Sequence, residues 1–188
     1  MAALYNNYLN GDDNAIENQG LLKLSADLGA TGPTDPHLLV FAWKLNSRVQ
    51  FQFFKDEFLT SLSLDNIFTK DKMIQHINKT LKELEQDGEL FRSWYAFVYE
   101  YLKSKQATVL SVEEAIIAWK ILGIPNRWKP FEKFEGYIIQ QKLKGINSDT
   151  WLMLLALIEK VGDDPNNYDE ADCWPSVLED FILDCWKS

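Results

Sequence analysis

Helical periodicity near the C-terminal end constrains the fold of this chain more than any other feature. In two short segments between residues 146 and 182, apolar side chains recur three and four positions apart, as on the buried face of a helix. The first stripe comprises Trp151, Leu154, Leu155 and Ile158, and the second comprises Val177, Leu178, Phe181, Ile182 and Cys185. The polar stretch 162–167 between them is typical of a turn, and Ser148 or Asp149 can cap the first helix. We therefore predict a helical hairpin with acidic residues outside its apolar stripes.

The rest of the chain carries further helical patterns and very little strand pattern. Apolar stripes with helical spacing begin at Met73 and at Phe91. Ser111 with Glu114 forms a capping box, which marks the start of another helix. Alternation with a period of two residues does not extend beyond 51–54. We predict an all-α fold.

The first half of the chain has the spacing of two EF-hands, each of which places a loop with one inward hydrophobic residue between two helices. Ile16 is the inward residue of the first loop. The second loop, 46–57, has Phe53 in the same role and follows a helix that Thr34 or Asp35 starts. We predict two EF-hand-like helix pairs whose short loop strands pair with each other, packed on a C-terminal helical subdomain.

The loop residues argue against calcium binding. A calcium loop needs oxygen-bearing side chains at positions 1, 3 and 5, a glycine at position 6 and a glutamate at position 12. The second loop has Arg48 at the third position and Phe51 at the sixth. The first loop, aligned on Ile16, begins with Leu9 and ends with Gly20. We therefore expect EF-hand-like pairs without calcium ligands, although a calcium sensor with altered ligands stays open as an alternative.

Charge is concentrated at the C-terminal end. The formal net charge is -9, and ten carboxylates but only two lysines lie from Asp149 to the end of the chain. This balance argues against nucleic acid and anionic membranes as partners, because both attract basic surfaces. It favours a basic protein surface as the partner, while a solvated acidic face is the simpler alternative.

The remaining composition indicates neither a cofactor nor catalysis. Cys173 and Cys185 follow no signal-like start and fit reduced thiols, and His37 and His76 are far from them in sequence, so we expect no metal site. Phosphate-binding glycine loops and nucleophile motifs are absent, and we predict a protein that is not an enzyme. Apolar runs are far shorter than the roughly 20 residues that span a bilayer. We expect the protein in the cytoplasm or nucleus.

Several motifs in one order resemble the defective-in-cullin-neddylation family. They are Asp149-Thr150-Trp151, Asn167-Tyr168-Asp169-Glu170, Trp174-Pro175 and Asp180-Phe181, with Ala42-Trp43-Lys44, Phe53, Glu57-Phe58 and Glu114-Ala115-Ile116 earlier in the chain. The resemblance runs from about residue 20 to residue 181. It implies a single potentiating-neddylation domain over 1–188, without a preceding ubiquitin-associated segment. Its EF-hand-like lobe would cover about 1–85 and its helical lobe about 86–188.

The resemblance also implies two binding sites. In the family, an Asp-Ala-Asp patch binds basic residues of the cullin C-terminal winged-helix domain. The matching positions here are Asp149, Cys173 and Glu179, with Asp180 next to them. A hydrophobic groove receives the acetylated N-terminus of the conjugating enzyme for the cullin-modifying ubiquitin-like protein. By position, the groove residues are Leu21, Leu38, Phe41, Ala42, Leu45, Phe51, Tyr101 and Ile121, for each of which a purely structural role in the core is the alternative.

The function that the resemblance implies is that of a monomeric scaffold-type co-ligase. It would promote neddylation by holding the cullin and the conjugating enzyme together, next to the RING subunit of the cullin ligase. A cullin-binding adaptor without neddylation activity is the alternative within the same family, because Cys173 and Glu179 depart from the Asp-Ala-Asp pattern.

Overall fold

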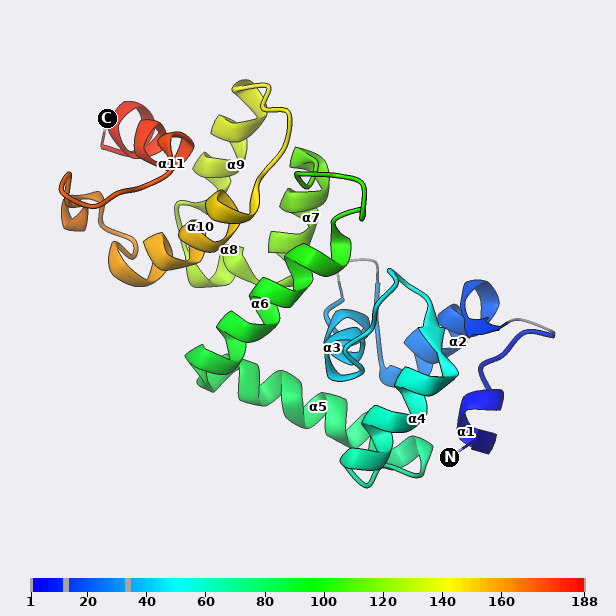
Figure 1. The fold of residues 1–188 in the computed structure, drawn as a ribbon. Helices are drawn as coiled ribbons and strands as arrows, with labels where there is room; N and C mark the ends of the chain where they lie inside the picture. Colours follow the sequence, from blue (N-terminus) through cyan, green and yellow to red (C-terminus); the bar gives the residue numbers. More distant parts are fainter. Residues whose placement is uncertain (1, 12–13, 33–34, 188) are drawn as a thin grey trace. The chain divides into compact units, whose positions relative to one another are not determined.

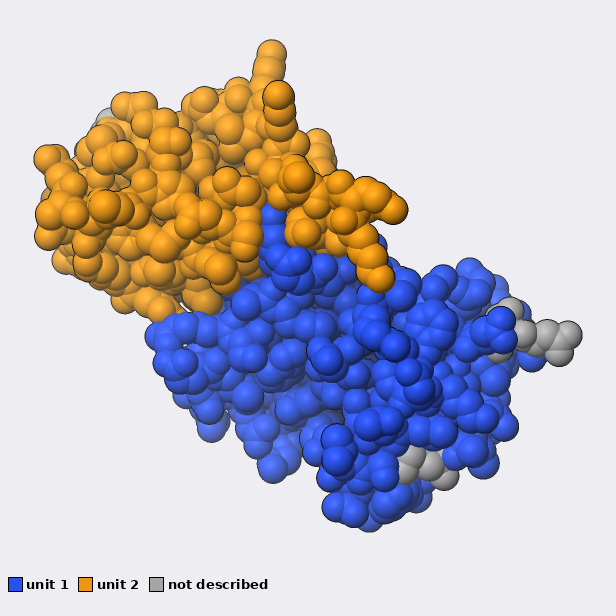
Figure 2. Space-filling model, in the orientation of Figure 1, with its two compact units in different colours: residues 1–101 blue, residues 102–188 orange. Residues whose placement is uncertain are grey.

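The all-α prediction is confirmed by a computed structural model, which describes residues 2–11, 14–32 and 35–187. Its chain divides into two compact units, Met1–Tyr101 and Leu102–Ser188 (Figure 2). The division falls at the end of a helix, Gly88–Leu102, and the lobe boundary near residue 86 that the resemblance implies stays a prediction. This helix belongs with the first unit because Tyr101, near its end, contacts Phe51.

Unit 1 contains the two predicted helix pairs. The strands β1 and β2 lie in the loops of the pairs and are antiparallel, with Ile16 opposite Phe53. Both side chains are fully buried, so the inward residues predicted for the two loops are confirmed. In the order of the chain (Figure 1), the elements of unit 1 are α1 Ala2–Asn6, β1 Ala15–Ile16, α2 Asn18–Leu28, α3 His37–Lys44, β2 Phe53–Phe54, α4 Lys55–Leu64, α5 Lys70–Gln86 and α6 Gly88–Leu102.

Aromatic side chains fill the core of unit 1. The ring of Phe41 packs edge-on against Phe53 and Phe58, at centroid distances of 5.2 and 6.0 Å, and Tyr5 packs on Phe58 at 5.3 Å. At the start of α3, Asp35 Oδ1 accepts the backbone N–H of His37 at 3.0 Å. Thr34, the other predicted cap, lies outside the described residues.

Unit 2 is formed by helices and short helical turns. The predicted capping box is confirmed, because Ser111 Oγ accepts the backbone N–H of Glu114 and the Glu114 carboxylate accepts that of Ser111, each at 3.2 Å. The elements of unit 2 are α7 Val112–Ile121, α8 Ile124–Arg127, α9 Phe131–Gln140, α10 Ser148–Lys160, the 3-10 turn η1 Pro165–Asn167, α11 Ser176–Phe181 and the π-helical turn η2 Ile182–Trp186.

The predicted C-terminal hairpin corresponds to α10 and α11 with the turn between them. Trp151 stacks on Trp119 at 5.2 Å, and Phe181 packs edge-on against Phe134 at 5.2 Å, so both apolar stripes face the core of unit 2. The cap of α10 differs from the prediction. Asn147 Oδ1 accepts the backbone N–H of Thr150 at 2.8 Å, so the helix begins at Ser148, one residue earlier than a Ser148 cap would give and two earlier than an Asp149 cap would give.

Candidate functional site

Three of the four predicted cullin-binding residues are carboxylates on α10 and α11, which pack against each other in unit 2. Asp149 lies in the first turn of α10 and is exposed. Asp180 is exposed on α11, and Glu179 is half-buried. Cys173, the fourth residue, is an exposed free thiol in the segment before α11. The structure therefore presents all four residues on one unit, on neighbouring elements.

The carboxylate of Glu179 is held by a buried tyrosine. Tyr168 donates its hydroxyl to Glu179 Oε1 at 3.0 Å and is only 7% exposed. Burial, together with the hydrogen bond and charge of Glu179 and the charges of Glu170 and Asp172, raises the pKa of Tyr168 to about 12. Three carboxylates therefore act on this hydroxyl, while Lys187 Nζ lies 4.7 Å from the centre of the Tyr168 ring.

Asp180 faces a different neighbour from Glu179. Burial raises the pKa of Tyr137 on α9, and the next contributions come from Asp180, Cys185 and Asp184. Consecutive residues of a helix point about 100° apart. The charge of Asp180 therefore acts toward α9, whereas that of Glu179 acts toward Tyr168.

The acidic residues are spread along α10. Asp149 lies in its first turn, whereas Lys160 in its last turn binds Asp172 with 2.6 Å between Nζ and Oδ1. Because a helix rises 1.5 Å per residue, Asp149 and Lys160 are about 16 Å apart along the axis.

The predicted groove residues of unit 1 differ widely in exposure. Phe41, Ala42 and Leu45 are buried in the core, with at most 1% of each side chain exposed. Leu21 and Leu38 are half-buried, and Phe51 is 37% exposed. Tyr101 is buried, and Ile121 is a half-buried residue of unit 2. The groove assignment stays a prediction, and within unit 1 the accessible positions are Leu21, Leu38 and Phe51.

The structure does bring Phe51 and Tyr101 together. Their rings meet edge-on at 5.9 Å, and the backbone N–H of Phe51 donates to the Tyr101 hydroxyl at 2.7 Å. The ring of Phe97 stacks on that of Tyr101, with 5.2 Å between the ring centroids. Burial raises the pKa of Tyr101 to about 12, so this hydroxyl stays protonated at neutral pH.

Sequence reasoning missed three features of these regions. Phe97 lies four residues before Tyr101, and this helical spacing was a usable signal. Tyr168 lies inside a recognised motif, but its contact with Glu179 depends on the tertiary fold. An apolar pocket of about 290 Å³ in unit 2 has no sequence signal; it is lined by Val112, Glu113, Ile116, Ile138, Ile139, Lys142 and Leu143.

Within 2–11, 14–32 and 35–187, no three His, Cys, Asp or Glu side chains are grouped as metal ligands. In the same part of the chain, no helix is both long enough and apolar enough to cross a bilayer.

The paired EF-hand-like loops of unit 1, and exposed carboxylates on α10 and α11 of unit 2, define a helical module with an acidic surface. The chain belongs to the cullin-binding family, because the family model described as "Cullin binding" matches residues 72–183, more than half of the chain. The resemblance that the motifs indicated is thereby confirmed.

Curated relatives are similar over most of this chain. DCN1-like protein 3 of Drosophila melanogaster is 29% identical over 184 residues, which are 97% of this chain and 54% of the relative. Human DCN1-like protein 3 is 27% identical over 183 residues, 95% of this chain and 60% of the relative. DCN1-like protein 5 of Bos taurus is 27% identical over 175 residues, 92% of this chain and 72% of the relative. The chain thus spans little more than half the length of the first two.

Proposed function

We propose that this protein is a non-catalytic adaptor that binds a cullin through the carboxylates of α10 and α11 and promotes cullin neddylation. The observation that carries the proposal is the family match, whose range 72–183 contains Asp149, Cys173, Glu179 and Asp180. The exposure of Asp149 and Asp180 supports it further, because a docking residue must be accessible before its partner arrives.

The proposed cullin contact is electrostatic. Complementary charges steer two proteins together and fix their register. Glu179 contributes a carboxylate that Tyr168 already orients, so less side-chain freedom is lost on binding. We propose a basic surface of the cullin winged-helix domain as the partner of these carboxylates.

The second proposed partner is the conjugating enzyme of the cullin-modifying ubiquitin-like protein. Leu21, Leu38 and Phe51 supply accessible apolar and aromatic surface on unit 1. An apolar peptide in a hydrophobic groove is a recurrent mode of recognition. Holding both partners raises their effective concentration to about millimolar and restricts their orientation near the RING subunit. The rate would then rise without any catalytic residue in this chain.

An adaptor that binds cullins without promoting modification is the second candidate. The exposed thiol of Cys173 stands where the family has a methyl group, and Glu179 is one methylene longer than aspartate. Reconstituted cullin modification, with and without this protein, separates the two candidates. A faster reaction supports the co-ligase, whereas cullin binding at an unchanged rate supports the adaptor.

Reversing the charge of Asp149 tests the cullin contact. We expect Asp149→Arg to weaken binding of the isolated cullin winged-helix domain by more than about tenfold, because losing one partner of a desolvated charge pair costs about 2–5 kcal/mol. Asp71→Arg is the matched control, since Asp71 is also an exposed aspartate in the second position of a helix, α5. Equal affinity of both variants in calorimetric titrations would refute the site.

A further inference from the structure

The second loop of unit 1, 46–57, shares two backbone features with a calcium loop. Phe51, at its sixth position, has a φ of 55°, which is the left-handed conformation that glycine adopts in an EF-hand loop. A bulky residue is strained in this conformation. Contacts with Tyr101 compensate, because Tyr101 accepts the Phe51 N–H and packs against its ring. The eighth position, Phe53, pairs with Ile16 in the sheet.

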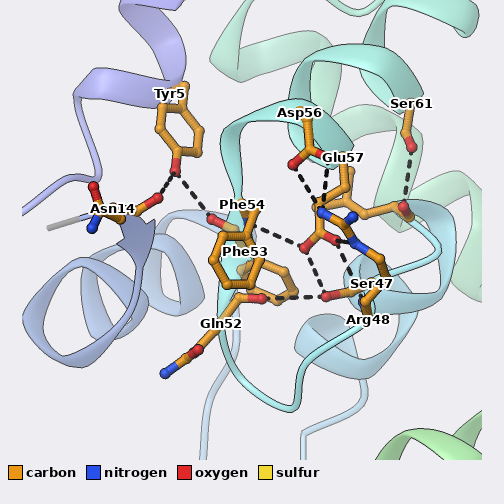
Figure 3. A network of polar contacts seen from close by, with 11 residues as sticks. Tyr5, Asn14, Ser47, Arg48, Gln52, Phe53, Phe54, Asp56, Glu57 and Ser61 are labelled. Carbon is orange, nitrogen blue, oxygen red and sulfur yellow. Dashed lines mark hydrogen bonds and ion pairs between the residues drawn. The ribbon is translucent and has the colours of Figure 1, made fainter.

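The twelfth position of the loop is Glu57, whose carboxylate is buried and fully engaged (Figure 3). Its side chain is 5% exposed. Oε1 accepts the Ser47 hydroxyl and the backbone N–H of Phe54, each at 3.0 Å. Oε2 accepts Nε of Arg48 at 3.2 Å. A calcium loop uses this same glutamate as a bidentate ligand.

Arg48 bridges two carboxylates at the end of the loop. Besides the contact with Glu57, its Nη2 atom lies 2.9 and 2.8 Å from the two carboxylate oxygens of Asp56. The guanidinium carbon lies 5.8 Å from the centre of the Phe54 ring. The guanidinium of Arg48 therefore contacts Asp56 and Glu57, the eleventh and twelfth loop residues, which lie in the first turn of α4. It also lies near the ring of Phe54, the ninth loop residue, which directly precedes α4.

We infer that Arg48 is the resident cation of this loop and takes the place that a calcium ion has in an EF-hand. A buried carboxylate is costly unless a positive charge pairs with it. The calcium ion meets this requirement in an EF-hand. Here Arg48, at the third position, which is itself a calcium-ligand position, supplies the charge from the surface of the loop: its side chain is 58% exposed, whereas that of Glu57 is 5% exposed. The contacts of Arg48 and Glu57 fix the part of the loop that flanks β2. Within β2, the Tyr5 hydroxyl also donates to the Phe53 carbonyl at 3.2 Å.

The inference predicts that unit 1 needs Arg48 and does not need calcium. We expect Arg48→Met to lower the midpoint of thermal unfolding by a few degrees, because Glu57 then keeps its bonds to Ser47 and Phe54 but loses a cation that solvent partly screens. Lys79→Met is the control, since it removes a cation from an exposed pair with Glu83 on α5. The wild-type midpoint should be the same in calcium chloride and in EDTA. An unchanged midpoint for Arg48→Met, or a wild type stabilised by calcium, would overturn the inference.

Arg48→Asp provides a second, independent test. It places a carboxylate at the third position, so Asn46, the new aspartate and Glu57 resemble a calcium-ligand set. We expect the variant to unfold at lower temperature in EDTA and to be restored in part by millimolar calcium chloride, with less effect from magnesium. Folding only in calcium would also support the inference. A variant as stable as the wild type in EDTA, or one that calcium does not stabilise, would contradict it.

Discussion

At the scale of single residues, the candidate cullin site depends on how each carboxylate is held. Glu179 is half-buried and bonded to Tyr168, whereas Asp149 is exposed at the start of its helix. A fixed carboxylate loses less freedom on binding than a mobile one. Tyr168 is therefore a positioning residue for Glu179 in the proposed contact.

Removing the hydroxyl of Tyr168 tests this role. We expect Tyr168→Phe to weaken binding of the cullin winged-helix domain by roughly two- to tenfold, since one hydrogen bond contributes about 0.5–1.5 kcal/mol. The combined variant Tyr168→Phe with Glu179→Gln should bind no more weakly than Glu179→Gln alone, because the hydroxyl acts through the carboxylate. Additive losses in calorimetric titrations would show that Tyr168 acts independently of Glu179.

At the scale of the helix, the start of α10 is set by an N-cap residue that the sequence analysis did not identify. Asn147 caps it, and Ser148 and Asp149 are its first two residues. We expect Asn147→Ala to lower the free energy of unfolding by about 1 kcal/mol, the usual cost of a lost cap. Ser148→Ala is the control and should change it by much less. Urea denaturation measures both, and equal losses would contradict the cap assignment.

The predicted groove residues on α3 differ in burial, so some have a structural role and others are accessible for binding. Phe41 and Ala42 are in the core, so substitutions there disturb the fold, whereas Leu38 in the first turn is half-buried. We expect Leu38→Arg to abolish binding of an acetylated conjugating-enzyme peptide and to leave the circular dichroism spectrum unchanged. Leu22→Arg on α2 is the control, because Leu22 is 64% exposed. Unaltered titration heats for Leu38→Arg would refute the groove.

At the scale of the whole molecule, the excess of negative charge governs the proposed encounter with the cullin. The net charge is -9, and the residues from Asp149 onward carry most of it. We expect cullin affinity to fall as sodium chloride rises, because salt screens exposed charges over about 8 Å at physiological ionic strength. Asp149→Arg should reduce the salt dependence as well as the affinity. A salt-independent affinity would argue for an apolar interface instead.

Much of the fold was predictable from local sequence. The helical stripes and the Ser111–Glu114 capping box follow from spacings of a few residues, and the pairing of Ile16 with Phe53 follows from the EF-hand spacing of the two loops. The motifs around Asp149 and Trp174 indicated the family. The cap of α10 was wrong, because Asn147, Ser148 and Asp149 are all good caps and only the actual backbone path selects among them.

The sequence by itself determined the helices, the EF-hand-like pairing and the concentration of acidic residues near the C-terminal end, because each is recorded in residues close together in the chain. Only the tertiary structure decided which of these residues are accessible and what holds them. Phe41 is in the core, Tyr168 holds Glu179, and Arg48 pairs with Glu57. The physical reason is that burial and charge pairing depend on segments that meet only when the chain has folded.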